Sequence, residues 1–223
     1  KYNFTYVTVS KWLEGIAKES YLKKNNILTI YNGIDMNIFK PVQSELRKKY
    51  NLEHKRIILG VASTWTQTKG LNDFILLSKI IPIEYKIVLI GLSKKQLSRI
   101  PQTILGFPRT ETVQELVEWY SVADIYLNTS VEETFGMPTL EAIACGTPVI
   151  VYNTTALPEI VEKGCGCISQ PHDIKMVLNN INEILNESVS IESLRTIAEK
   201  YKKEKVYKEY IELYEKIYKG GRG

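Results

Sequence analysis

The chain has 223 residues, enough for one large domain or for one domain with appended segments. Apolar residues make up 44% and charged residues 24%, so the composition excludes a disordered chain and allows a sizeable core. The three cysteines are too few, and odd in number, for a disulfide framework. No run of the sequence approaches the roughly 20 apolar residues that cross a bilayer as a helix.

Strands and helices are predicted to alternate along the chain. Short runs rich in β-branched, aliphatic and aromatic residues predict strands, and runs that are apolar throughout indicate strands buried on both faces. The predicted strands cover residues 4–10, 27–31, 56–62, 86–91, 103–106, 124–128, 147–152 and 165–169. Apolar residues at helical spacing predict helices between them. The predicted helices cover residues 11–24, 42–50, 70–80, 94–98, 110–121 and 136–144, and most of the chain after 169.

This alternation predicts an α/β fold with a parallel sheet and helices on both faces. Ligands of such sheets bind beyond the carboxyl ends of the strands. The loops that leave those ends are therefore the candidate binding loops, and they cover residues 63–70, 106–111, 130–139 and 153–159.

The net charge of +4 lies in the last part of the sequence. Residues 195–222 hold nine Lys or Arg against five Asp or Glu, so the rest of the chain is neutral overall. A basic terminal helix can attract anionic lipid head groups, or it can be an ordinary solvated helix face. Binding to nucleic acid is not expected, because the lysines alternate with glutamates and no recognition motif accompanies them.

Two glutamates eight positions apart mark the sharpest candidate site. Glu133 falls in a predicted loop after a strand, and Glu141 falls inside the helix that begins near Gly136, a residue that allows a tight turn close to a ligand. A carboxylate one turn into that helix can accept hydrogen bonds from vicinal hydroxyls such as those of ribose. The helix start is expected to expose free backbone N–H groups, which suit a diphosphate. These are the N–H groups of Met137, Thr139 and Leu140.

Residues 133–149, with the sequence ETFGMPTLEAIACGTPV, closely resemble the E-x7-E signature of retaining glycosyltransferases of the GT-B fold, in particular the family 4 type. Further segments resemble the same family in the same order, namely residues 31–41, 69–70, 120–124 and 158–159. The resemblance implies that the sheet is Rossmann-like and forms the C-terminal, sugar-donor-binding half of a GT-B fold.

The resemblance also implies three regions. Residues 1–40 would be a remnant of the N-terminal domain, its last strand and helix, followed by the interdomain linker. Residues 41–194 would be the nucleotide-sugar-binding domain. Residues 195–223 would form an amphipathic helix that packs back on the N-terminal domain, which is missing from this chain. Apolar residues recur at helical spacing from Tyr207 to Tyr218, as such a helix requires.

Roles for single residues follow from the resemblance. Glu141 would bind the ribose hydroxyls, and Glu133 would act in catalysis by contacting the donor sugar and stabilising the charge that develops at the anomeric carbon. Lys69 would neutralise the diphosphate. The backbone of Met137 to Leu140 would cradle the distal phosphate, with Gly136 bringing it close to the donor. Gly106 with its neighbours would line the base pocket.

One departure from the family affects the phosphate site. The family usually has an Arg five or six positions before the Lys, but here those positions hold Thr64 and Ser63. Arg109 lies on a neighbouring strand-end loop, where it is either a replacement for that cation or an ordinary surface charge. Trp65 either shields the site or packs in the core.

In a retaining transfer the new bond lies on the same face of the sugar as the bond that breaks. The family is thought to use a front-face route, in which the departing phosphate helps to deprotonate the acceptor hydroxyl. That chemistry needs positioning and electrostatic stabilisation of the leaving diphosphate, so no cofactor and no essential metal ion are expected. The acceptor would be a glycan or a lipid-linked molecule in surface polysaccharide synthesis. The isolated chain would bind nucleotide sugar weakly and transfer nothing.

Two other functions stay open at this point: a GT-B sugar-nucleotide epimerase, and a sugar-nucleotide-binding module without catalytic activity. The expected location is the cytoplasm, with the alternative of a peripheral contact with the cytoplasmic face of a membrane.

Overall fold

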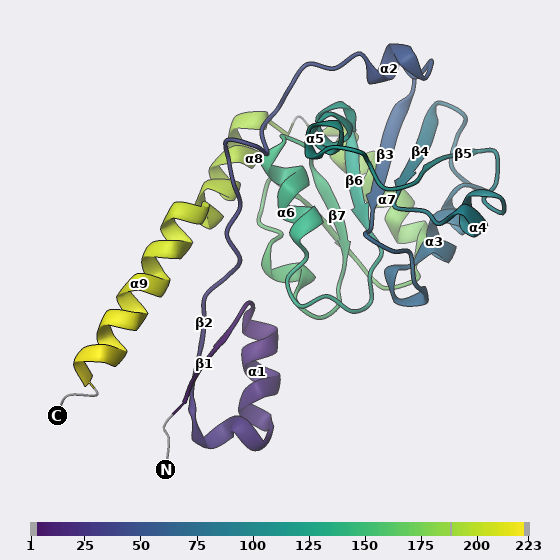
Figure 1. Ribbon diagram of the computed structural model, residues 1–223. Coiled ribbons are helices and arrows are strands. Elements are labelled where there is room, and N and C mark those ends of the chain that lie inside the picture. The colour runs from purple at the N-terminus through teal and green to yellow at the C-terminus, as the bar shows by residue number, and fades with distance from the viewer. Residues whose placement is uncertain (1–3, 188, 221–223) are drawn as a thin grey trace.

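The computed structural model describes residues 4–187 and 189–220 and divides them between two sheets (Figure 1). The smaller sheet has two parallel strands, β1 (Thr5–Thr8) and β2 (Asn26–Thr29). Helix α1 (Lys11–Glu19) and the 3-10 turn η1 (Tyr21–Lys24) join them. These four elements are called the N-terminal unit below. Residues 1–3 of the predicted remnant lie outside the described residues.

The larger sheet has, within the described residues, six parallel strands in the order β5-β4-β3-β6-β7-β8. The strands are β3 (Arg56–Val61), β4 (Tyr85–Ile90), β5 (Ile104–Phe107), β6 (Ile125–Asn128), β7 (Val149–Tyr152) and β8 (Gly166–Ser169). This is the strand order of the doubly wound dinucleotide-binding fold, whose direction of winding reverses between its first and fourth strands. The reversal, called the switch point below, lies here between β3 and β6.

Helices cover both faces of the larger sheet (Figure 1). One face, which carries Leu59 and Val88, packs against α5, α6 and α8. The other face, which carries Ile58 and Leu89, packs against α3 and α7. The helices are α2 (Leu46–Lys49), α3 (Leu71–Leu77), α4 (Lys94–Leu97), α5 (Val113–Val122), α6 (Met137–Ala144), α7 (Ile174–Asn186) and α8 (Ile191–Ala198). The 3-10 turns η2 (Gln67–Lys69) and η3 (Leu157–Glu159) lie in loops.

Burial on both faces explains why the strands could be predicted. Every residue of β6 and β7 is buried, so no position along these strands calls for a polar side chain. The predicted α/β class, with a Rossmann-like parallel sheet between helices, is confirmed.

The end of the chain differs from the predicted single helix. Residue 195 lies inside α8, whose Leu194 and Ile197 are buried against the core around α6. Arg195 Nη1 also donates to the carbonyl of Ala144 at 3.0 Å. The turn η4 (Glu199–Tyr201) then separates α8 from α9 (Lys203–Gly220). The larger sheet and the helices that cover it are called the main domain below. The apolar face of α8 holds α8 on the main domain, whereas α9 projects away from it (Figure 1). The last three residues of the predicted helix, 221–223, lie outside the described residues.

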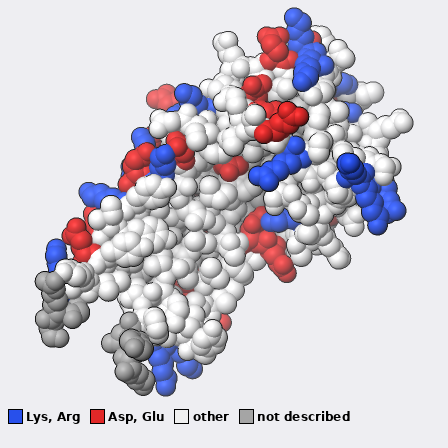
Figure 2. Space-filling model, in the orientation of Figure 1, with Lys and Arg blue, Asp and Glu red and all other residues white. Residues whose placement is uncertain are grey.

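The surface of α9 is amphipathic. Figure 2 shows acidic and basic side chains together along its outer edge, whereas the visible surface between α9 and the N-terminal unit carries few charges. Tyr207, Ile211 and Tyr214 of the predicted apolar stripe are exposed. Their packing on a preceding domain stays a prediction. Among the described residues, no helix is long and apolar enough to cross a membrane.

Candidate functional site

The loop after β3 and the loop after β6 meet at the switch point. Val131 N donates to the carbonyl of Thr68 at 2.8 Å, and Thr129 Oγ1 donates to the carbonyl of Lys69 at 3.0 Å. Gly70 has a φ of 74°, and a Cβ at this position would lie 2.4 Å from the carbonyl oxygen of Thr129. The two loops therefore approach more closely than a residue with a side chain would allow.

This contact brings two predicted site residues together. Lys69 Nζ lies 2.5 Å from Glu133 Oε1, and the two side chains keep 27% and 16% of their surface exposed. The pair is thus half-buried but within reach of a ligand at the carboxyl edge of the sheet. A charge-assisted contact of this kind is stronger than one between neutral groups, and less screened than a fully exposed ion pair.

Glu133 is held from the other side by the loop that follows β7. Its backbone N–H donates to Thr155 Oγ1 at 3.0 Å, and its carbonyl accepts from Ala156 N at 3.3 Å. The carboxylate is therefore placed by three loops, those after β3, β6 and β7, all at the carboxyl edge of the sheet.

A cavity of about 530 Å³ opens at the same edge. It lies beyond the ends of β3 and β4, under the loop after β5, and against α5 and α6. Its walls are Val61, Ala62, Ser63, Ile90, Arg109, Thr110, Glu111, Thr112, Val113, Leu116, Pro138 and Glu141. Lys69 and Glu133 are not among them and lie on neighbouring loops. Apolar walls with a few charged groups are typical of sites for small organic ligands.

Two carboxylates line this cavity, those of Glu111 and Glu141, and the one held from the core is Glu141. Tyr120 is fully buried and donates its hydroxyl to Glu141 Oε2 at 2.8 Å. Burial raises the pKa of Glu141 above its usual value of 4.5, while the hydrogen bond from Tyr120 opposes that shift. Tyr120 thus fixes one carboxylate oxygen, and the carboxylate remains able to accept hydrogen bonds from hydroxyl groups in the cavity.

The start of α6 differs from the sequence expectation. Gly136 has a φ of 97°, and a Cβ there would lie 2.7 Å from Leu157 Cδ2. This backbone turns the Gly136 carbonyl into the helix, where it accepts from Thr139 N at 2.9 Å and from Leu140 N at 3.4 Å. The N–H groups of Thr139 and Leu140 are therefore not free, and both side chains are buried. The N–H of Met137 has no acceptor among the described residues.

Three further residues can now be placed. Arg109 is exposed, lines the cavity and forms no ion pair with any acidic residue that the structure describes. Gly106 does not line the cavity, since a Cβ at Gly106 would meet Ile100 and Leu92 instead. Trp65 packs edge-on against Phe74 in the core and is 5% exposed, so it does not shield the site.

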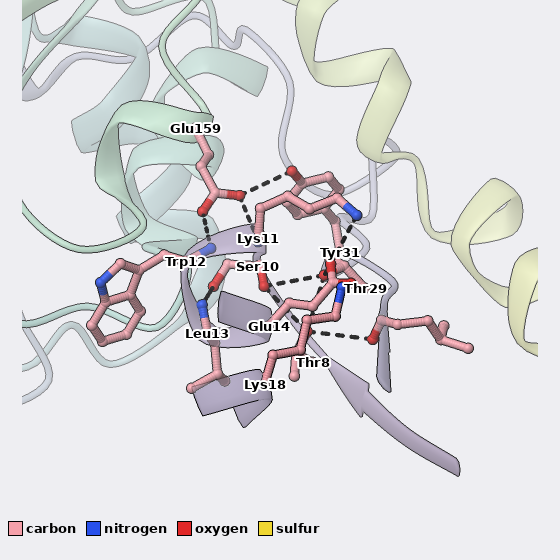
Figure 3. Close-up of polar contacts among 11 residues, drawn as sticks. Thr8, Ser10, Lys11, Trp12, Leu13, Glu14, Lys18, Thr29, Tyr31 and Glu159 are labelled. Carbon is pink, nitrogen blue, oxygen red and sulfur yellow. Dashed lines mark hydrogen bonds and ion pairs between the residues drawn. The ribbon is translucent and has the colours of Figure 1, made fainter. Parts of the chain in front are cut away.

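A second polar cluster joins the N-terminal unit to the main domain (Figure 3). The carboxylate of Glu159, in η3, accepts from Lys11 N at 2.8 Å and from Trp12 N at 2.7 Å, the first two N–H groups of α1. Tyr31 also donates to Glu159, at 2.9 Å. Ser10 caps the third N–H of the helix. A carboxylate at a helix start satisfies free N–H groups and is favoured by the helix dipole.

Inside the N-terminal unit, Glu14 ties α1 to β2. Its carboxylate accepts from Lys18 at 2.6 Å, from Thr29 at 2.7 Å and from Lys11 at 2.9 Å. These hydrogen bonds, led by that from Lys18, lower the pKa of Glu14 to about 2.

Several residues of the site gave no signal of their role in the sequence. Tyr120 belongs to residues 120–124, which resemble the family, but no role of its own followed from the sequence. Thr155 and Thr129 belong to loops whose pairing depends on the folded sheet. The contact of Glu159 with Trp12 joins residues that are 147 positions apart. Only a known topology brings such residues together.

Comparisons with known proteins agree with this architecture. The family model described as "Glycosyl transferases group 1" matches residues 42–205. N-acetyl-alpha-D-glucosaminyl L-malate synthase of Bacillus anthracis is 26% identical, over 92% of this chain and 58% of that protein. The capsular polysaccharide biosynthesis glycosyltransferase CapM of Staphylococcus aureus is 23% identical, over 97% of this chain and 63% of that protein.

Solved structures share the fold. Anabaena HepE, in a crystal structure with UDP-glucose, superposes with a TM-score of 0.81 at 19% identity, over 94% of this chain and 63% of that one. The chain therefore spans about three fifths of the length of each of these proteins.

Proposed function

The chain belongs to the group 1 glycosyl transferases, and we propose that its larger sheet carries the nucleotide-sugar site of a retaining glycosyltransferase. The whole protein would transfer the sugar to a glycan or a lipid-linked acceptor in surface polysaccharide synthesis. HepE was crystallised with UDP-glucose and CapM is named for capsular polysaccharide biosynthesis, which supports this class of substrate and product.

One observation carries the proposal. The cavity that holds Glu141 and the Lys69–Glu133 pair lie side by side at the carboxyl edge of the sheet, next to the switch point. Nucleotides bind at this place in doubly wound sheets. The arrangement offers an apolar space for a base, a carboxylate for a ribose and cations for a diphosphate, in adjoining positions.

Each group then has a part in binding. Glu141 would accept hydrogen bonds from the ribose hydroxyls, with Tyr120 holding the carboxylate in place. Lys69 would leave Glu133 to contact the diphosphate. Arg109, which forms no ion pair among the described residues, would supply a second cation from the cavity wall. The N–H of Met137 would be the backbone donor at the start of α6.

Glu133 would contact the hydroxyls of the donor sugar and stabilise the positive charge at the anomeric carbon during transfer. The departing phosphate would help to deprotonate the acceptor hydroxyl. The proposal assigns neutralisation of the diphosphate to Lys69 and Arg109 and not to a metal ion. A chelator is accordingly expected to leave nucleotide affinity unchanged. The 223-residue chain alone is expected to bind nucleotide without transferring sugar.

A thermal-shift panel of UDP, GDP, ADP and CMP tests the proposal on the chain itself. A nucleotide at ten times its Kd stabilises the folded state by about 1.4 kcal/mol. For a chain of this size that corresponds to a rise in Tm of about 3–6 °C. We expect one diphosphate to raise the Tm selectively, and Glu141→Ala to abolish the shift. A panel without any shift would count against a nucleotide site in this chain.

A further inference from the structure

We propose that Glu159 is a positioning residue that couples docking of the N-terminal unit to the placement of Glu133. The connection is the loop after β7, residues 153–159, which contacts α1 at one end and the Glu133 backbone at the other. Only the part of Glu133 in sugar transfer rests on the proposed function. The mechanical coupling stands on the contacts alone.

At one end of the loop, a single carboxylate holds the start of α1. Both oxygens of Glu159 are used, one by Trp12 N and the other by Lys11 N and the hydroxyl of Tyr31 (Figure 3). Because the first N–H groups of a helix have no partner within the helix, removal of this carboxylate leaves two of them without an acceptor in the protein. The docking of α1 therefore depends on the position of Glu159.

At the other end, the same loop fixes the backbone of Glu133. Thr155 accepts from its N–H, and the N–H of Ala156 donates to its carbonyl. Thr155 has a φ of 48°, a left-handed conformation that a β-branched residue adopts only when its surroundings impose it. The contact with Glu133 is thus part of a conformation that the folded loop maintains at a cost.

The segment between the two ends is packed and cannot absorb a displacement locally. Ala156, Leu157 and Ile160 are fully buried. Leu157 lies directly against Gly136 at the start of α6, where there is no space for even a Cβ. Thr154 Oγ1 donates to the carbonyl of Ser130 in the loop after β6. A shift of Glu159 is therefore passed to the loop that carries Glu133, because closely packed groups transmit strain.

Amide hydrogen exchange on the 223-residue chain tests the coupling. Glu159→Gln keeps the shape of the side chain but replaces one acceptor oxygen with an amide group that donates. We expect the N–H groups of Lys11 and Trp12 to exchange about fivefold faster or more, and those of Glu133 and Ala156 to accelerate with them.

The matched control is Glu162→Gln, since Glu162 lies three residues further on and pairs with the exposed Lys200. This control substitution is expected to leave the exchange rates of the amides of Lys11, Trp12, Glu133 and Ala156 unchanged. Backbone amides of Leu59 and Val88 in the central strands report global unfolding. If Glu159→Gln accelerated exchange only at Lys11 and Trp12, the coupling would be refuted.

Coupling must also act in reverse, because a coupling free energy is the same from either site. Thr155→Ala removes the hydroxyl that accepts from Glu133 N and that forms no hydrogen bond to α1 within the described residues, and it is expected to accelerate exchange at Lys11 and Trp12. No acceleration there would overturn the proposal.

Should Glu159→Gln destabilise the whole chain, Tyr31→Phe removes one of the three hydrogen bonds to Glu159 and gives a milder perturbation. No nucleotide enters these experiments, so failure of nucleotide binding and failure of the coupling are separate results.

Discussion

The ammonium group of Lys69 and the carboxylate of Glu133 lie 2.5 Å apart, so two groups expected to contact a sugar donor are paired with each other. A diphosphate must draw Lys69 away from Glu133 before it can bind. Glu133→Gln removes that competition and should tighten the binding of a nucleoside diphosphate that carries no sugar. Lys69→Gln should weaken it by about tenfold, which corresponds to about 1.4 kcal/mol for one charged contact.

Titration calorimetry measures the Kd of the nucleoside diphosphate for both variants, and this Kd should fall in Glu133→Gln and rise in Lys69→Gln. Lys95→Gln, which removes an exposed lysine of α4, is the control and should leave the affinity unchanged. Equal weakening in Glu133→Gln and Lys69→Gln would show that the ion pair itself is needed to hold the nucleotide.

The raised pKa of Glu141 gives nucleotide binding a pH dependence. The carboxylate accepts hydrogen bonds from hydroxyls better than the protonated acid, so affinity should fall as the pH is lowered through a midpoint above 4.5. Tyr120→Phe removes the hydrogen bond that opposes the shift and should move the midpoint to higher pH. Dissociation constants measured between pH 4.5 and 8 check both statements, and an identical midpoint in wild type and Tyr120→Phe would contradict the role given to Tyr120.

The raised pKa of Glu141 also predicts how replacement of Glu141 changes the free energy of unfolding. Because the pKa of Glu141 is higher in the folded than in the unfolded chain, its ionisation opposes folding as the pH rises through that range. Glu141→Gln should therefore stabilise the ligand-free chain at neutral pH while it weakens nucleotide binding. Urea unfolding of both chains at pH 7 provides the comparison.

Arg109 is expected to matter for ligand and not for folding. It is exposed and forms no ion pair within the described part of the chain, so Arg109→Ala should change the free energy of unfolding by less than about 0.5 kcal/mol. If it supplies the second cation, diphosphate affinity should fall about tenfold, and the affinity for the uncharged nucleoside should not change. Equal losses for both ligands would assign Arg109 to the base pocket instead.

Glu14 makes the stability of the chain depend on pH in the acid range. Its pKa is about 2 in the folded chain against a usual 4.5, so its contribution is complete above 4.5 and is lost as the pH falls towards 2. Glu14→Gln should cost about 1–2 kcal/mol at pH 7, since charge-assisted hydrogen bonds are lost but Lys11 and Lys18 are more than half exposed.

The cost of Glu14→Gln should shrink between pH 4.5 and pH 3 in urea unfolding experiments. Glu53→Gln, at an exposed position, serves as the reference. A cost that stays constant over this range would mean that Glu14 acts through its shape and not its charge.

The strands of the larger sheet were predictable because their burial on both faces leaves an uninterrupted apolar run, as in β6 and β7. The positions of Lys69, Glu133 and Glu141 at one edge followed from the rule that parallel strands end on the same side. Helix ends were less predictable. The helix expected to reach residue 24 ends at Glu19, where Ser20 takes an extended backbone and starts the turn η1.

Contacts between loops could not be predicted, because they depend on where distant segments meet. The capping of α1 by Glu159 has a sequence separation of 147 or more residues, and no local pattern marks it. A Cβ at Gly106 would meet Ile100 and Leu92, and the sequence alone does not show which face of β5 that position occupies. The loss of free N–H groups at Thr139 and Leu140 depends on the backbone angle at Gly136.

A calorimetric titration locates the nucleotide. The diphosphate selected by the thermal-shift panel would be titrated into the wild-type chain, Glu141→Gln and Glu187→Gln. The last variant changes an exposed glutamate at the cavity on the opposite, amino-terminal edge of the sheet. We predict that the Kd rises about tenfold or more in Glu141→Gln and is unchanged in Glu187→Gln. An unchanged Kd in Glu141→Gln, or an equal rise in both variants, would contradict a nucleotide site at the carboxyl edge.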